Sequence, residues 1–171
     1  MKKNGPTMTR HISSQVHSTP DEFLCAVEGR FDLIALDLAA TKRNAVVADF
    51  ISKRQNSLKQ DWTKLLRGRM GYLNPPFDPM EPWVNKCVAE ASKGARFVVL
   101  SQASVDSNWF WKMFPHCAVY ALTPRIKFVG NTTGFPKPLI LSAFNLIGHG
   151  VAEWEVGHLA RWHWKRDTVT Q

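Results

Sequence analysis

One tetrapeptide, Asn74-Pro75-Pro76-Phe77, combines residue types that can hold a planar group bearing an –NH2. Two successive prolines fix the backbone φ angle and remove two backbone donors, which leaves carbonyl groups free to accept hydrogen bonds. Asn74 adds a side-chain carbonyl in the same rigid frame, and the Phe77 ring offers an apolar face for stacking. Because Asn-Pro-Pro also begins many ordinary turns, the tetrapeptide alone predicts either an amine-binding loop or a simple turn.

A second residue that could take part in chemistry is Asp37, at the carboxyl end of an apolar segment. Residues 31–38 and 70–73 both have the composition of buried strands, and the second run ends at Asn74. Ligands of open α/β sheets bind at the carboxyl ends of the strands. We therefore expect Asp37 and Asn74 to share one crevice although they are 37 residues apart. The alternative is that Asp37 only caps the segment that follows it.

The elements that must position these residues alternate between strand and helix patterns. Ser18 or Thr19, followed by Pro20 and two acidic residues, predicts a helix start with a hydroxyl cap and a helix that ends near Glu28. We expect further helices over 46–52, 58–66, 83–92 and 108–114, and strands over 31–38, 70–73, 96–100, 118–122 and 138–144. The alternation predicts a three-layer α/β fold with a mostly parallel sheet covered on both faces.

The length of 171 residues suits one such domain. We expect residues 1–16 to form a flexible basic arm, residues 17–150 the α/β domain, and residues 151–171 a basic aromatic helix or tail. In that last segment, residues 162–166 predict either a contact with nucleic acid or a helix that packs its tryptophans.

The remaining composition narrows the class of protein. No run approaches 18 consecutive apolar residues and the basic N-terminus lacks a signal-peptide stretch, so we expect a cytoplasmic protein without a membrane segment. Three cysteines without a CxxC spacing, and scattered histidines, predict reduced core residues and no metal site.

The net charge of +8 is concentrated in one part of the chain, because residues 41–70 contain eight basic and only two acidic side chains. A solvated helical face explains such a run, and so does a surface that displaces counterions from phosphates. The charge therefore makes nucleic acid a plausible partner without identifying it.

The order and spacing of the segments resembles the bacteriophage DNA N6-adenine methyltransferase family, which is related to amino-methyltransferases with an [Asp/Asn/Ser]-Pro-Pro-[Tyr/Phe] signature. The specific matches are Asn74-Pro75-Pro76-Phe77 and Leu36-Asp37-Leu38-Ala39-Ala40. The resemblance covers residues 17–144, with phenylalanine in place of the commoner tyrosine at Phe77. Supporting matches are Thr19-Pro20 with Phe23, Leu58, Asp61, Trp62, Trp83, Trp109-Phe110 and Arg125-Ile126-Lys127-Phe128.

This resemblance implies a Rossmann-like class I methyltransferase domain that moves a methyl group from S-adenosylmethionine to the N6 amine of adenine in double-stranded DNA. It implies a protein of a bacterial or phage-infected host cytoplasm. Asn74 and the Pro75 carbonyl would bind the target amine, Pro76 would stiffen the loop, and Phe77 would stack on the flipped base. The residues implied to hold the cofactor are Thr19, Pro20, Asp37, Ala39, Ala40 and, more weakly, Asp61.

Charge and resemblance together suggest six DNA-binding residues, which are Lys42, Arg43, Lys53, Arg54, Arg125 and Lys127. Two alternatives stay open. The same loop chemistry would serve an RNA adenine or a protein amide, because either presents a planar –NH2. The second alternative is a non-catalytic DNA-binding protein with a methyltransferase-like fold, although such a protein has no need of the intact loop together with Asp37.

Overall fold

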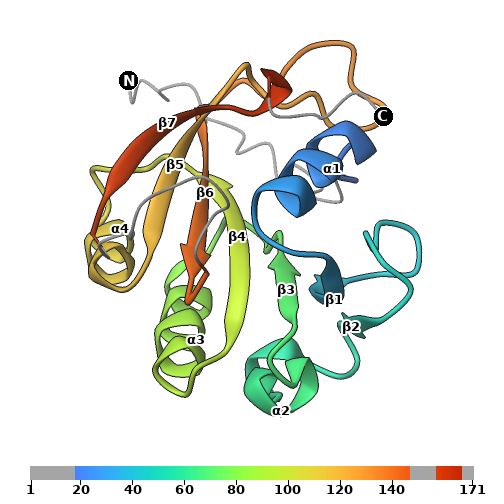
Figure 1. Cartoon of the computed structure of the whole chain (residues 1–171), viewed down its shortest axis with the longest axis vertical. Helices are drawn as coiled ribbons and strands as arrows, with labels where there is room; N and C mark the ends of the chain where they lie inside the picture. Colours follow the sequence, from blue (N-terminus) through green and yellow to red (C-terminus); the bar gives the residue numbers. More distant parts are fainter. Residues whose placement is uncertain (1–17, 147–156, 167–171) are drawn as a thin grey trace, which may run out of the picture.

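Seven strands of a single sheet organise the part of the chain that the computed structural model describes, which is residues 18–146 and 157–166 (Figure 1). The predicted arm over residues 1–16, and residues 151–156 and 167–171 of the predicted tail, lie outside the described residues. The strand order is β2-β1-β3-β4-β6-β5-β7. The strands are β1 (Ile34–Ala40), β2 (Phe50–Ser52), β3 (Met70–Leu73), β4 (Arg96–Gln102), β5 (Ala118–Thr123), β6 (Leu139–Phe144) and β7 (Leu159–His163).

All strands run the same way except β6, which is antiparallel to both β4 and β5. The expected α/β class with a mostly parallel sheet is therefore confirmed. Among the described residues, no helix has the length and apolar character needed to span a membrane.

The direction in which the chain adds strands reverses around β1. The chain passes from β1 to β2 on one side, and then crosses back to β3 on the other side. In open α/β sheets the ligand site lies at such a reversal, beyond the carboxyl ends of the strands. The topology therefore places the ligand-binding position of this fold between the ends of β1 and β3.

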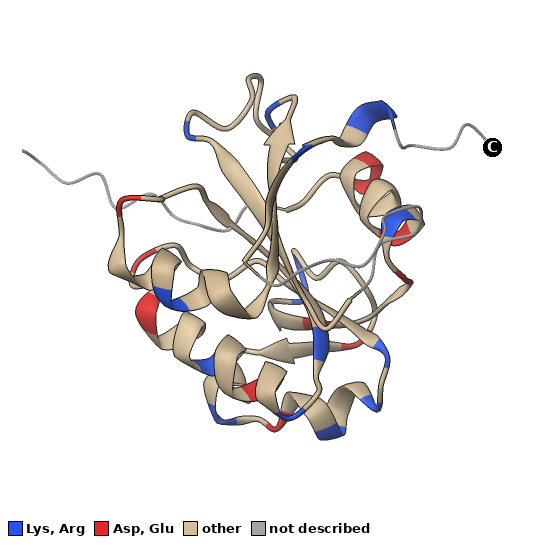
Figure 2. Ribbon diagram, turned by 60° about the vertical axis from the view of Figure 1, so that its left-hand side comes forward, with Lys and Arg blue, Asp and Glu red and all other residues tan. Residues whose placement is uncertain are grey.

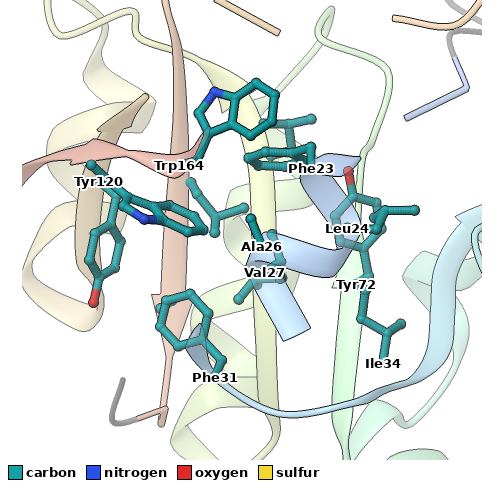
Figure 3. Close-up of a cluster of buried hydrophobic side chains, with 14 of the residues drawn as sticks. Phe23, Leu24, Ala26, Val27, Phe31, Ile34, Tyr72, Tyr120 and Trp164 are labelled. Atoms are coloured by element: carbon teal, nitrogen blue, oxygen red, sulfur yellow. The ribbon is translucent and has the colours of Figure 1, made fainter. Parts of the chain in front are cut away.

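Helices cover both faces of the sheet. The first face carries α1 (Asp21–Arg30), whose apolar side chains pack with Tyr72, Tyr120 and Trp164 (Figure 3). The other face carries α2 (Trp62–Leu66), α3 (Glu81–Ser92) and α4 (Asn108–Met113), which pack on the opposite side chains of the same strands. Two single-turn 3-10 helices, η1 (Ser57–Lys59) and η2 (Phe114–His116), connect these elements.

The predicted helix over residues 46–52 is wrong. Residues 41–49 form a loop and Phe50–Ser52 form the short edge strand β2, parallel to β1. The backbone N–H of Val46 donates to the Asp37 carboxylate rather than to a carbonyl one turn earlier. A tertiary contact therefore replaces the local hydrogen bonds that a helix would need. The predicted helix over residues 58–66 is divided between η1 and α2.

Within the C-terminal aromatic segment, for which we expected a helix or a tail, residues Leu159–His163 form a strand. Strand β7 pairs in parallel with β5, and η3 (Trp164–Arg166) follows it. Trp162 and Trp164 are two residues apart and both are buried in the cluster under α1. Trp162 lies in β7 and Trp164 begins η3, and both belong to the core.

One buried carboxylate ties the helical layer together. Glu90 of α3 accepts hydrogen bonds from Lys86 at 2.7 Å, from Lys93 at 2.9 Å and from the Thr63 backbone at 3.2 Å. Burial alone raises the pKa of Glu90, but these three bonds outweigh it and lower that pKa to about 2. The ionised form of Glu90 is therefore the stabilising one.

We predict that Glu90 contributes on the order of 2 kcal/mol to stability at neutral pH. A depressed folded-state pKa means that this contribution is complete above the ordinary pKa of 4.5 and is lost as the pH falls toward about 2. Urea unfolding of the wild type and of Glu90→Gln measures it. The difference between the two proteins should shrink between pH 7 and pH 3, whereas the exposed Glu81→Gln on the same helix should change little at either pH. A difference independent of pH would contradict this account.

Candidate active site

The Asn74-Pro75-Pro76-Phe77 loop leaves the carboxyl end of β3 and leads into α3. Pro75 is buried, Pro76 is exposed, and Asn74 and Phe77 are half-buried, so both functional side chains are partly accessible. The Asn74 Nδ2 atom points to Thr19 Oγ1 at 3.5 Å, the long limit of a hydrogen bond. Because the amide nitrogen faces Thr19, the side-chain carbonyl Oδ1 is turned away from Thr19.

Asp37 lies at the fourth position of the seven-residue strand β1, three residues before the end at which it was expected. Its side chain is only 3% exposed, and its two oxygens accept from the backbone N–H groups of Ala39 and Val46, each at 3.1 Å. Burial raises the pKa of Asp37, and these two bonds only partly oppose that effect. Among the described residues no Lys or Arg forms an ion pair with Asp37, so the site suits a cationic ligand group.

Tyr72 lies between the two sites. It is the register partner of Asp37 across β1 and β3, and it lies two residues before Asn74. Its hydroxyl is 2.9 Å from Thr19 Oγ1, and burial raises its pKa, so that it stays neutral. Asp37, Tyr72, Thr19 and Asn74 are thus brought together on the side of the sheet covered by α1, near the reversal of strand order.

Thr19 does not have the predicted role of a helix cap. The N-cap residue of α1 is Pro20, whose carbonyl accepts from the backbone N–H groups of Phe23 and Leu24. The Thr19 hydroxyl is instead turned inward to Tyr72. This places Thr19 and Pro20, both predicted site residues, beside the Asn74 loop.

Three aromatic rings line up next to that loop. Phe77 meets Phe135 edge to face with ring centres 5.9 Å apart, and Phe135 meets Phe128 in the same way at 5.5 Å. Phe135 belongs to the connection between β5 and β6, where its N–H donates to Ile126 O at 2.8 Å. Sequence reasoning missed Phe135, because a turn-rich stretch gives no local sign of the strand end that it reaches.

The other predicted cofactor residues divide between two places. Ala39 and Ala40 form the end of β1, two and three residues after Asp37. Asp61 lies apart from them in the helical layer, where its Oδ1 accepts from the Lys64 backbone at 3.1 Å as the N-cap of α2. The structure therefore groups Ala39 and Ala40 with Asp37 and gives Asp61 a capping role.

The six predicted DNA-binding residues are all exposed, and each follows the carboxyl end of a strand. They are Lys42 and Arg43 after β1, Lys53 and Arg54 after β2, and Arg125 and Lys127 after β5. These strands are parallel, so the six cations belong to the same edge of the sheet as Asn74. Four other cations of the basic segment lie around α2 and before β3, and Figure 2 shows Lys and Arg on several faces of the molecule.

No group of three or more His, Cys, Asp or Glu side chains suited to a metal ion occurs in the described ranges. Fold and site together define an α/β protein with a switch point in a mostly parallel sheet, where a buried carboxylate lies on one strand and an amide loop leaves the next.

The family described as DNA N-6-adenine-methyltransferase (Dam) matches residues 7–138. The chain belongs to this family, as the resemblance in its motifs implied. A DNA N-6-adenine-methyltransferase of Escherichia phage T1 is 28% identical over 144 residues, which cover 75% of this chain and 59% of that protein. One of Haemophilus phage HP1 is 32% identical over 111 residues, which cover 61% of this chain and 58% of that protein.

In both cases the aligned region spans less than two thirds of the phage protein's length. No solved structure matches the chain.

We predict that Asp37 holds the loop over residues 41–49 as well as the end of β1. In Asp37→Ala the N–H groups of Ala39 and Val46 lose their acceptor, and each such bond is worth about 1 kcal/mol. Hydrogen exchange at these two amides should accelerate roughly five- to tenfold. The control is Asp49→Ala, which removes an exposed carboxylate from the same loop. Unchanged exchange at both amides in Asp37→Ala would show that the loop is held by other contacts.

Proposed function

We propose that the chain transfers the methyl group of S-adenosylmethionine to the N6 amine of adenine in double-stranded DNA. The observation that carries this proposal is the placement of Asp37 and the Asn74 loop on adjacent parallel strands at the switch point of the sheet. Membership of the DNA N-6-adenine-methyltransferase family supports it independently. We further propose that the domain is a Rossmann-like class I methyltransferase fold.

The residues on the β1 side fit the cofactor. S-adenosylmethionine supplies an electrophilic methyl group on a sulfonium and carries a cationic amine. Asp37 offers a buried carboxylate that no described Lys or Arg neutralises, which suits that amine. The small side chains of Ala39 and Ala40 leave room for close approach to the strand end, and Thr19 and Pro20 flank the same position.

The residues on the β3 side fit the base. Asn74 Oδ1 and the Pro75 carbonyl would accept the two hydrogens of the adenine amine and hold its nitrogen toward the methyl group. Phe77 would stack on the ring, with Phe135 as its lateral support at 5.9 Å. Flipping the base costs a few kcal/mol, and stacking on an aromatic side chain returns about 1–3 kcal/mol.

S-adenosylmethionine would supply the methyl group: an N–C bond would form as the C–S bond breaks, the sulfur would keep the electron pair, and the amine nitrogen would release one proton to water. An aryl amine is a weak nucleophile because its lone pair is delocalised into the ring. Acceptors placed out of the ring plane would localise that lone pair on nitrogen. The contribution of the chain is therefore orientation of the two reactants and selection of the amine geometry.

We predict that Asn74→Ala abolishes methyl transfer while S-adenosylmethionine affinity stays within a few-fold of the wild type. The reason is that the substitution removes an acceptor for the amine and leaves the Asp37 side unchanged. Incorporation of tritiated methyl groups into DNA and cofactor titration measure the two quantities. Asn85→Ala, an exposed asparagine on α3, is the matched control and should keep full activity. Retained turnover in Asn74→Ala would mean that another loop carries the reaction.

The same assay separates the alternative activities. Competition between DNA, RNA and a glutamine-containing protein as methyl acceptors tests the substrate class, and methylation of RNA or protein in preference to DNA would overturn the proposal. A thermal shift with S-adenosylmethionine tests the non-catalytic alternative, because a pure DNA-binding protein should show no stabilisation at saturating cofactor.

Another prediction concerns the DNA-binding edge, by which we mean the edge of the sheet where the six predicted DNA-binding residues follow the strand ends. Replacing Lys42, Arg43, Lys53 and Arg54 by Gln removes four charges that follow β1 and β2. We expect weaker DNA binding and a slope of log affinity against log salt that is shallower by up to roughly three units. The control replaces the same number of charges in the same segment, at Lys59, Lys64, Arg67 and Arg69, around α2 and before β3. Equal losses in the two variants would place the DNA elsewhere or show that only total charge matters.

A further inference from the structure

We propose that Tyr72 is a positioning residue for the transfer reaction, and that it acts through Thr19 on the side-chain amide of Asn74. This inference rests on the proposed function, because it concerns how Asn74 receives the target amine. It assigns a role to a buried hydroxyl that none of the motifs contains.

The contacts form a short chain of polar groups beneath the loop. Tyr72 is fully buried under α1, beside Leu24 (Figure 3), and its hydroxyl is 2.9 Å from Thr19 Oγ1. Thr19 is 6% exposed, and the same Oγ1 atom is 3.5 Å from Asn74 Nδ2. One threonine oxygen therefore lies between the tyrosine hydroxyl and the catalytic amide.

The backbone keeps Thr19 in this place. A residue before proline is restricted to extended conformations, and Pro20 follows Thr19. Since Pro20 is the N-cap of α1, and its carbonyl serves the first turn, the Thr19 hydroxyl is available for the sheet side. A threonine next to a helix start ordinarily bonds to the backbone of that helix, so its inward direction here indicates another use.

The hydrogen-bond inventory then limits which way the amide turns. Either oxygen of the Tyr72–Thr19 pair could be the donor, and the proposed role requires that Thr19 donates. A threonine hydroxyl has one hydrogen to donate and two lone pairs to accept. When Thr19 donates to the Tyr72 oxygen, only lone pairs remain for Asn74, so Asn74 must present its NH2 to Thr19. The Asn74 carbonyl then faces the position of the target amine.

Loss of the tyrosine hydroxyl removes this constraint. Without it, the Thr19 hydrogen is free to donate to Asn74 Oδ1, and the amide turns over. An NH2 group would then face the NH2 of the adenine, donor against donor. The turnover number would fall, while the stacking surface, the carboxylate and the DNA-binding edge would stay as they are.

The chain contains two tyrosines, which gives a matched control. Tyr120 is also fully buried in the cluster under α1, but it lies on β5, separated from β3 by the two strands β4 and β6. Tyr72→Phe and Tyr120→Phe each remove one buried hydroxyl from the same core. Only the first should affect the amide of Asn74.

The experiment measures kcat, the KM for DNA and the Kd for S-adenosylmethionine in the full chain. We expect Tyr72→Phe to lower kcat roughly ten- to a hundredfold, with KM and Kd changed less than about threefold. Tyr120→Phe should keep the kcat of the wild type. Thr19→Ser should also keep most of it, because the hydroxyl remains, whereas Thr19→Val should lose as much as Tyr72→Phe. The double variant Thr19→Val with Tyr72→Phe should be no slower than either single variant, since both break one chain.

Wild-type kcat in Tyr72→Phe, or equal losses in Thr19→Ser and Thr19→Val, would overturn the positioning role while the proposed function stands. A wild-type protein without methyl transfer to DNA would overturn both. A urea unfolding curve shows whether Tyr72→Phe is folded. If it is not, the comparison of Thr19→Ser with Thr19→Val decides the question, because both leave the tyrosine in place.

Discussion

The parallel pairing of β1 with β3 is the constraint on which the site depends. It sets Asp37 opposite Tyr72, and therefore sets the carboxylate beside the strand from which the Asn74 loop leaves. Side chains alternate between the two faces of a strand, so a shift of one residue in this register would turn Asp37 to the opposite face. The apolar residues next to Asp37 resist such a shift, because Leu36 and Leu38 both pack in the core under α2, α3 and α4.

The two faces of the sheet have different roles. The face under α2, α3 and α4 is an apolar core with one ion-paired carboxylate at its margin, and it supplies rigidity. The face under α1 contains Asp37, Tyr72 and Thr19 at one end of a large aromatic cluster. The loops that follow β1 and β5 reach the face under α1, through Val46 and Phe135. The polar side chains of Thr19, Asp37 and Tyr72 thus lie at one end of one face, where the strand order reverses.

Sequence patterns predicted the elements that local signals define. The bounds of β3 were predicted without error, and α3, β4, α4, β5 and β6 were predicted to within two residues at either end. The failures have a common cause, because each depends on a distant partner. Residues 46–52 follow a helical pattern but are held by Asp37 and β1, and Trp162 lies in strand β7 because β5 offers an edge for it to pair with. Phe135 gave no local sign of its place in the site, since nothing near it in sequence marks the strand end that it reaches. Tyr72 lies in a strand that was predicted, but its contact with Thr19 is 53 residues away in sequence.

The energetics of Asp37 differ from those of Glu90, the other buried carboxylate. A carboxylate that is almost wholly buried loses most of its hydration, and two backbone hydrogen bonds recover only part of that loss, as the raised pKa indicates. Glu90 has the opposite balance, because Lys86 and Lys93 bring its pKa down to about 2. The fold therefore contains one buried carboxylate that two lysines pair with, and another for which only backbone N–H groups are found as partners among the described residues. Only the second lies at the switch point, where a cationic ligand group would supply the missing charge.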